Sequence, residues 1–158
     1  MLIYILRHAD AAALATTDEV RPLTKKGVNQ AEIVGEFCAK HKINPQVIIS
    51  SPLLRAAETA QIVAHHLPDA ETVMDARLES GMEPETGFEV IREYAKSTSV
   101  MLVGHQPDLG AFVASFLSND ASMAVNFRKA AIIAIESESF NQGGGALEFF
   151  VPVRLMHG

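Results

Sequence analysis

Three short runs of apolar residues constrain the fold of this chain more than any other feature. They cover Leu2–Leu6, Val47–Ser50 and Val100–Val103. Each run is almost continuously apolar rather than apolar at alternate positions, a pattern typical of strands that are covered on both faces of a parallel sheet. Helix-like segments follow the runs. This alternation predicts an α/β fold, a three-layer sandwich with a mostly parallel central sheet between helices.

Capping residues and helical spacing predict the elements between these strands. A helix is expected over Lys25–Lys42, with Thr24 as its N-cap. Ser51 followed by proline predicts the start of a second helix over Pro52–His66. The other expected elements are a strand over Glu71–Met74, a loop over Glu79–Gly87, helices over Phe88–Lys96 and Asp108–Leu117, and an antiparallel hairpin of strands Ala130–Ile135 and Leu147–Val151.

Length and composition narrow the class of protein. A chain of 158 residues fits one domain, so we expect residues 1–158 to fold as a unit. The net charge of −6 argues against nucleic-acid or anionic-membrane partners, because both need a basic face. A single cysteine, Cys38, suits a reducing compartment, and the chain start lacks signal-peptide features. Since no apolar run approaches the ~20 residues that span a bilayer, we expect a cytoplasmic protein.

The three strands end in residues that can carry chemistry. Arg7 and His8 follow the first strand, Arg55 follows the second by one helical turn, and His105 follows the third. In open α/β sheets, ligands bind outside the carboxyl ends of the parallel strands. If the three strands are parallel neighbours, two imidazoles and two guanidiniums therefore converge on one crevice.

This set of side chains points to phosphoryl chemistry. Guanidinium groups bind doubly charged oxyanions well, because each presents a planar fork of donors. The sequence has no P-loop, no glycine-rich dinucleotide loop and no set of residues with metal-ligand spacing, so we expect no cofactor and no metal. A neutral imidazole can attack phosphorus directly, giving a phosphohistidine intermediate that water cleaves, while the arginines stabilise the equatorial oxygens.

Four segments resemble, in the same order, the motifs of the histidine phosphatase superfamily. They are Leu6-Arg7-His8-Ala9, Leu23-Thr24-x-x-Gly27-x-x-Gln30-Ala31, Ser51-Pro52-Leu53-Leu54-Arg55-Ala56-x-x-Thr59-Ala60 and Val103-Gly104-His105-Gln106-Pro107. Each motif alone is a weak signal, but the ordered set extends over roughly two thirds of the chain and is specific.

The resemblance implies a role for each matching residue. His8 would be the nucleophile, and Arg7, Arg55 and His105 would form the phosphate pocket, with Gln106 at its edge. The fold would be that of the phosphoglycerate mutase-like proteins. The short chain is most similar to the SixA-type phosphohistidine phosphatases, which lack the large cap insertion of the sugar-phosphate enzymes. The implied partner is a histidine-phosphorylated protein, such as a phosphotransfer or phosphocarrier domain.

The chain departs from the family pattern at two places. Ala9 replaces the usual glycine after the nucleophile, so its methyl group either tightens the site or is simply tolerated. Many members also carry a glutamate that acts as general acid. Glu79 and Glu83 lie in the corresponding region, and the sequence is compatible with either of them or with neither. Phosphohistidine needs little acid help, because imidazole leaves more readily than an alkoxide.

Three hypotheses follow. The first is a phosphohistidine phosphatase acting on a protein, and the second is a phosphatase of small phosphomonoesters, which needs a competent acid and an enclosing pocket. The third is a non-catalytic module that binds phosphoproteins. Both phosphatase hypotheses require an unprotonated His8, and both predict a protonated His105 that helps to hold the phosphate.

Overall fold

The computed structural model describes residues 1–120 and 122–156. In this part of the chain a six-stranded sheet has the order β3-β2-β4-β1-β5-β6. The first four of these strands run parallel, and β5 and β6 form an antiparallel hairpin at one edge. The strands are β1 (Leu2–Arg7), β2 (Val47–Ser50), β3 (Glu71–Met74), β4 (Ser99–Gly104), β5 (Ile132–Ser137) and β6 (Gly145–Val151).

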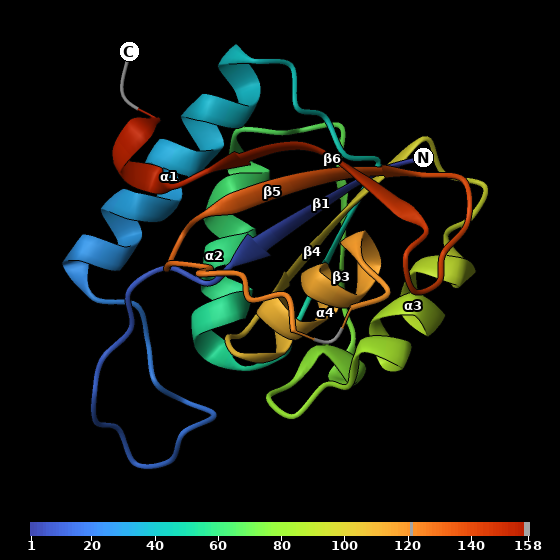
Figure 1. The fold of residues 1–158 in the computed structure, drawn as a ribbon. Helices are drawn as coiled ribbons and strands as arrows, with labels where there is room; N and C mark the ends of the chain where they lie inside the picture. Colours follow the sequence, from blue (N-terminus) through green and yellow to red (C-terminus); the bar gives the residue numbers. More distant parts are fainter. Residues whose placement is uncertain (121, 157–158) are drawn as a thin grey trace.

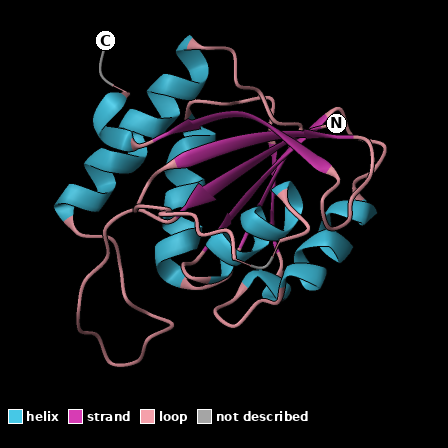
Figure 2. Cartoon of the chain, viewed as in Figure 1, coloured by secondary structure: helices cyan, strands magenta, loops and turns pink. Residues whose placement is uncertain are grey.

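Helices cover both faces of the sheet, as Figures 1 and 2 show. Helices α1 (Lys25–Lys40) and α2 (Leu54–His65) pack on one face, and α3 (Pro84–Glu93) and α4 (Asp108–Leu117) pack on the other. Two short 3-10 turns, η1 (Ala76–Leu78) and η2 (Val153–Leu155), complete the described elements. The predicted three-layer sandwich with a mostly parallel sheet is therefore confirmed.

The central strand β1 shows why its sequence is continuously apolar. Ile3 and Ile5 are buried in the core beneath α3 and α4, whereas Tyr4 and Leu6 are buried in the core beneath α1 and α2. Successive side chains of a strand point to opposite faces, so a strand between two helical layers needs apolar residues at every position.

Several predicted boundaries are wrong in ways that have physical reasons. Helix α2 begins at Leu54 rather than Pro52, and Leu53 is its N-cap. The Ser51 hydroxyl accepts from the N–H of Leu53 ahead of the helix and also contacts a histidine ring. Helix α3 begins at Pro84, within the predicted loop. Gly87, the last residue of that predicted loop, lies inside the helix. A Cβ there would lie 2.8 Å from the Phe112 ring, so this glycine lets α3 pack closely on α4.

The parallel register brings three strand ends together. Arg7 pairs with Gly104, and Ser50 pairs with Val103, so β1, β4 and β2 end side by side. The loop that follows β1 projects from the body of the protein next to these ends (Figure 1). The fold therefore brings together the residues that follow the carboxyl ends of these three strands, as predicted. No helix in the described residues is long and apolar enough to cross a membrane.

Candidate active site

His8 stands directly after β1 and is almost buried, with 7% of its surface exposed. Its Nδ1 lies 2.7 Å from the carbonyl oxygen of Ala9. A carbonyl oxygen can only accept a hydrogen bond, so Nδ1 carries the hydrogen and donates it. In the neutral ring the lone pair therefore sits on Nε2. The local backbone thus selects the tautomer in which Nε2 is the nucleophilic atom.

His105 follows β4 and faces His8, with 5.3 Å between the two ring centroids. Its Nε2 is 2.8 Å from the Ser51 hydroxyl oxygen, which also accepts a hydrogen bond from the backbone of Leu53. Ser51 is predicted from the sequence as a helix cap, and no local pattern marks its contact with His105. The strand ends of β2 and β4 are neighbours, which explains how Ser51 reaches the ring.

The two arginines flank the histidines. Arg7 donates from Nη1 to the carbonyl oxygen of Phe127 at 2.8 Å. Arg55, only 3% exposed, donates from Nη1 to the carbonyl oxygen of Asp18 at 3.0 Å and from Nη2 to its carboxylate at 3.1 Å. Asp18 comes from the projecting loop after β1. No sequence signal marked this residue, because loop residues have no periodic pattern.

The site contains unusual unpaired polar atoms. Within the described residues, the buried side-chain nitrogens or oxygens without a protein partner are Nε of Arg7, Nε of Arg55 and Nδ1 of His105. Buried polar groups are nearly always hydrogen-bonded, so three exceptions at one sheet edge need an explanation. An oxyanion ligand offers several acceptors together and suits two guanidiniums and an imidazole.

Both imidazoles are held neutral in this environment. Burial, together with the nearby charges of Arg55, Arg7 and Lys129, lowers the pKa of His8 to about 4, although the hydrogen bond to the Ala9 carbonyl acts in the opposite direction. Burial and the neighbouring His8 and Arg55 lower the pKa of His105 to about 3. The expectation that a protonated His105 helps to hold the phosphate concerns the complex and stays a prediction. A bound phosphoryl dianion would act in the opposite direction, because a negative charge favours the protonated form of a nearby ring.

The segment after His8 is held by residues of two sequence motifs. The backbone N–H of Ala9 donates to Thr59 Oγ1 at 3.0 Å, and the N–H of Asp10 donates to Gln30 Oε1 at 2.9 Å. The Thr24 hydroxyl donates to the Asp10 carboxylate at 2.7 Å. A Cβ on Gly27 would lie 1.9 Å from the Asp10 carbonyl oxygen, so only glycine permits this approach. These motifs therefore position the chain around His8.

Ala9 is itself fully buried in the core between the sheet and helices α1 and α2. Its N–H bonds to Thr59 and its carbonyl accepts from His8, so both backbone groups are used within the protein. The methyl group that replaces the family's usual hydrogen is thus accommodated by core packing.

Within the described structure, the remaining predicted site residues form no hydrogen bond or ion pair with the two histidines, although Ser80, next to Glu79, lies 3.5 Å from Nη2 of Arg55. Glu79 and Glu83 are exposed, on either side of the turn between η1 and α3. Gln106 accepts a hydrogen bond from the N–H of Gly110 and donates to the carbonyl oxygen of Val125, so its amide braces the start of α4. Roles for these three residues in catalysis or substrate binding stay predictions. In the described residues, no group of three or more histidine, cysteine, aspartate or glutamate side chains is arranged to hold a metal ion.

Comparison with known proteins decides the family. The model of the histidine phosphatase superfamily (branch 1) matches residues 3–81. The chain belongs to this superfamily. Phosphohistidine phosphatase SixA of Escherichia coli (strain K12) is 29% identical over 122 residues, which cover 72% of this chain and 73% of that protein. The SixA homologue of Haemophilus influenzae is 30% identical over 125 residues, covering 72% and 76% of the two chains.

A solved structure supports the fold over the whole chain. The protein histidine phosphatase SixA complexed with tungstate has a TM-score of 0.90 with this chain at 23% identity, covering 99% of this chain and 100% of that one. The predicted superfamily, the phosphoglycerate mutase-like fold and the assignment to a phosphatase are confirmed.

The contact at Gly27 makes a prediction for a single added methyl group. We expect Gly27→Ala to destabilise the protein by about 1–3 kcal/mol, because the Asp10 backbone or helix α1 must move. It should also lower kcat/KM, because Asp10 lies two residues after the candidate site residue His8. Urea unfolding and steady-state kinetics measure both effects. Val28→Ala, at a position of the same helix that is 42% exposed, serves as the control and should change the stability by less than about 0.5 kcal/mol. Equal stabilities of Gly27→Ala and wild type would contradict the close contact.

The neutral histidines make stability depend on pH. The folded-state pKa values of His8 and His105, about 4 and about 3, lie below the ordinary 6.5, so the unfolded chain binds more protons in this range. The stabilisation is complete above about pH 6.5 and is lost as the pH falls toward 4. We expect a loss on the order of a few kcal/mol between pH 7 and pH 4, measured by urea unfolding.

The double variant His8→Asn with His105→Gln should flatten this pH dependence, whereas His65→Gln, at an exposed helix end, should leave it unchanged. A slope that is the same in the double variant and the wild type would show that other groups cause the effect.

The hydrogen bond that the Asp18 carboxylate accepts from the guanidinium of Arg55 leads to a third prediction. A phosphoryl group that binds this guanidinium meets a like charge and a competing acceptor. Asp18→Asn should therefore tighten the binding of inorganic phosphate by about 3- to 10-fold, measured by calorimetry. Asp69→Asn removes one exposed negative charge elsewhere and should leave the affinity unchanged. Weaker binding in Asp18→Asn would mean that Asp18 orients the arginine for the anion.

Proposed function

We propose that the protein is a metal-independent phosphohistidine phosphatase that acts on a phosphorylated protein, with His8 as its nucleophile. One observation carries this proposal. His8 donates its Nδ1 hydrogen to the Ala9 carbonyl, which leaves an unprotonated Nε2 beside cationic side chains. A neutral imidazole at this position is suited to attack a phosphorus atom whose oxygens pair with guanidinium groups.

The reaction has two steps. Nε2 of His8 forms a bond to phosphorus while the bond to the substrate's imidazole nitrogen breaks, and that nitrogen takes a proton from solvent. The phosphorylated ring of His8 carries positive charge, and the Ala9 carbonyl stabilises it through the hydrogen bond from Nδ1. Water then attacks phosphorus, the bond to Nε2 breaks, and inorganic phosphate leaves with the ring neutral again.

Arg7, Arg55 and His105 have the complementary role of holding the phosphoryl oxygens. Their unpaired nitrogens supply donors, and the fixed charges of the two arginines stabilise the equatorial oxygens as the phosphoryl group transfers. His105 is neutral in the free protein, because burial lowers its pKa. When the dianion binds, its negative charge raises this pKa, and His105 gains a proton.

The leaving group supports phosphohistidine as the substrate class. Glu79 and Glu83 are exposed and make no hydrogen bond or ion pair within the described structure that would aim a carboxylate at the site. A substrate whose leaving group needs little protonation fits such a site best. The named relatives are SixA-type phosphohistidine phosphatases, which favours the same class.

We also propose that residues 1–158 form a single domain without a cap insertion and that the protein is located in the cytoplasm.

The test is to trap the intermediate. A synthetic phosphohistidine peptide labelled with ³²P is mixed with enzyme and quenched in base within milliseconds. We expect an acid-labile, base-stable label on His8, located by mass spectrometry. His8→Asn should form no phosphoenzyme and lose at least about 10³-fold in kcat/KM, while His65→Asn should behave as wild type. Label on another residue, or turnover by His8→Asn, would refute the nucleophile.

The acid variants separate the substrate classes. Glu79→Gln and Glu83→Gln should each change kcat/KM for the phosphohistidine peptide by less than about threefold, because no acid is needed. If either variant loses about 10²–10⁴-fold and the wild type prefers a sugar phosphate, the protein is a phosphatase of small phosphomonoesters.

A further inference from the structure

A basic pocket adjoins the active site at the same edge of the sheet. Its volume is about 420 Å³. It is formed by the end of β1, the start of α1, residues 126–129 and the region of η2, segments that are far apart in the sequence. Its charged lining residues are Arg7, Asp10, Lys26, Arg128, Lys129 and Arg154, and we call this cavity the basic pocket.

The charge of the basic pocket is opposite to that of the whole protein. Five of the 13 lysines and arginines of the chain line it, against a single carboxylate, although the protein carries a net charge of −6. Like charges repel when they are gathered in one place, so such a cluster on an acidic protein raises the free energy of the folded state unless an anion binds there.

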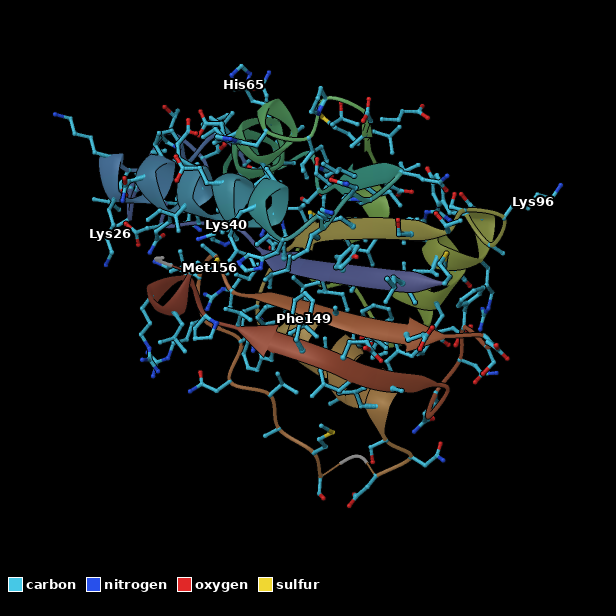
Figure 3. The ribbon with its side chains drawn as sticks, turned by 90° about the horizontal axis from the view of Figure 1, so that it is seen from above. Lys26, Lys40, His65, Lys96, Phe149 and Met156 are labelled. Atoms are coloured by element: carbon cyan, nitrogen blue, oxygen red, sulfur yellow. The ribbon has the colours of Figure 1, made fainter. Side chains whose placement is uncertain are left out.

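Most of these cations form no ion pair in the described part of the chain. Lys129 pairs with Asp10 at 2.7 Å. Lys26 forms no ion pair with Asp10, although its charge helps to lower the pKa of that carboxylate. Among the described residues, no hydrogen bond or ion pair engages the side chains of Arg128 or Arg154. Figure 3 shows Lys26 at the end of α1, beside the turn that bears Arg154.

The helix itself adds to the positive potential. Lys26 lies in the first turn of α1, which contains no acidic residue. The helix dipole makes this end positive, so a lysine here is unfavourable for the isolated helix and favourable only toward an anion. The helix end and the unpaired side chains therefore both favour a negatively charged ligand.

The position of the basic pocket links it to the reaction. Arg7 lines the pocket and also belongs to the phosphate site, and the charge of Lys129 acts on His8. An anionic group in the pocket therefore sits next to a phosphoryl group at His8. The lining includes no aromatic ring on which a nucleotide base would stack. Separate cations on several segments suit several carboxylates on a protein surface.

We propose that the basic pocket binds acidic side chains that flank the phosphohistidine of the protein substrate. This inference rests on the proposed function and extends it, because it names the surface chemistry by which the substrate is chosen. Charge complementarity of this kind mainly accelerates association and selects among partners. The enzyme thereby discriminates among phosphohistidine proteins by the charge around the modified residue.

The test uses two synthetic phosphohistidine peptides that differ only in flanking residues, glutamates in one and glutamines in the other. Wild-type kcat/KM should be at least about tenfold higher for the acidic peptide at low salt, and this preference should fall as salt rises. The triple variant Lys26→Glu, Arg128→Glu, Arg154→Glu should lose or reverse the preference. Its kcat/KM for free phosphohistidine, which has no flanking residues, should change by less than about threefold.

A control variant tests whether the loss of preference is specific to the basic pocket. Lys40→Glu, Lys42→Glu, Lys96→Glu makes the same change in net charge away from the basic pocket, and Lys96 lies at the far end of the molecule from Lys26 (Figure 3). It should retain the preference. Equal wild-type rates on both peptides, or the same loss in both triple variants, would overturn the proposal.

A binding measurement separates this inference from the proposed function. The unphosphorylated acidic peptide, labelled with a fluorophore, should bind wild type more tightly than the glutamine peptide does, and the basic-pocket variant should abolish the difference. If this binding is seen but neither phosphopeptide is hydrolysed, the proposed function fails while the pocket's selectivity stands. If both peptides are hydrolysed but bind equally, the proposal for the basic pocket fails alone.

Discussion

The hydrogen bond from His8 Nδ1 to the Ala9 carbonyl is the interaction on which the rest of the site depends. It selects the tautomer, orients the ring and leaves Nε2 with its lone pair. The bond requires a fixed backbone after β1, and the chain supplies this through Thr59, Gln30 and the close approach at Gly27. These three motif residues thus act on the His8 ring through the backbone, by holding one carbonyl oxygen in place.

Electrostatics explains why the site is ready for an oxyanion. Two neutral imidazoles are buried beside the guanidiniums of Arg7 and Arg55, and three polar atoms of this group have no protein partner. Such an arrangement is costly on its own and is relieved by a ligand that brings negative charge and several acceptors. The basic pocket continues the same positive field outward along Arg7 and Lys129.

The sequence predicted the parts of the site that depend on regular structure. Parallel strands end at one edge, so the residues after β1, β2 and β4 had to meet there, and Thr24 marked the start of α1. Contacts made by loops followed no such rule. Asp18 and Lys129 reach the site from segments without periodicity. The pKa values of the histidines also depend on burial in three dimensions, which a local pattern does not encode.

The most direct measurement is the protonation state of the His8 ring by ¹⁵N NMR, using long-range ¹H–¹⁵N correlations to both ring nitrogens in the free protein. We expect a neutral ring at pH 6, with the hydrogen on Nδ1 and an unprotonated Nε2 that titrates only near pH 4. A ring that is an imidazolium at pH 6, or that carries its hydrogen on Nε2, would contradict the account.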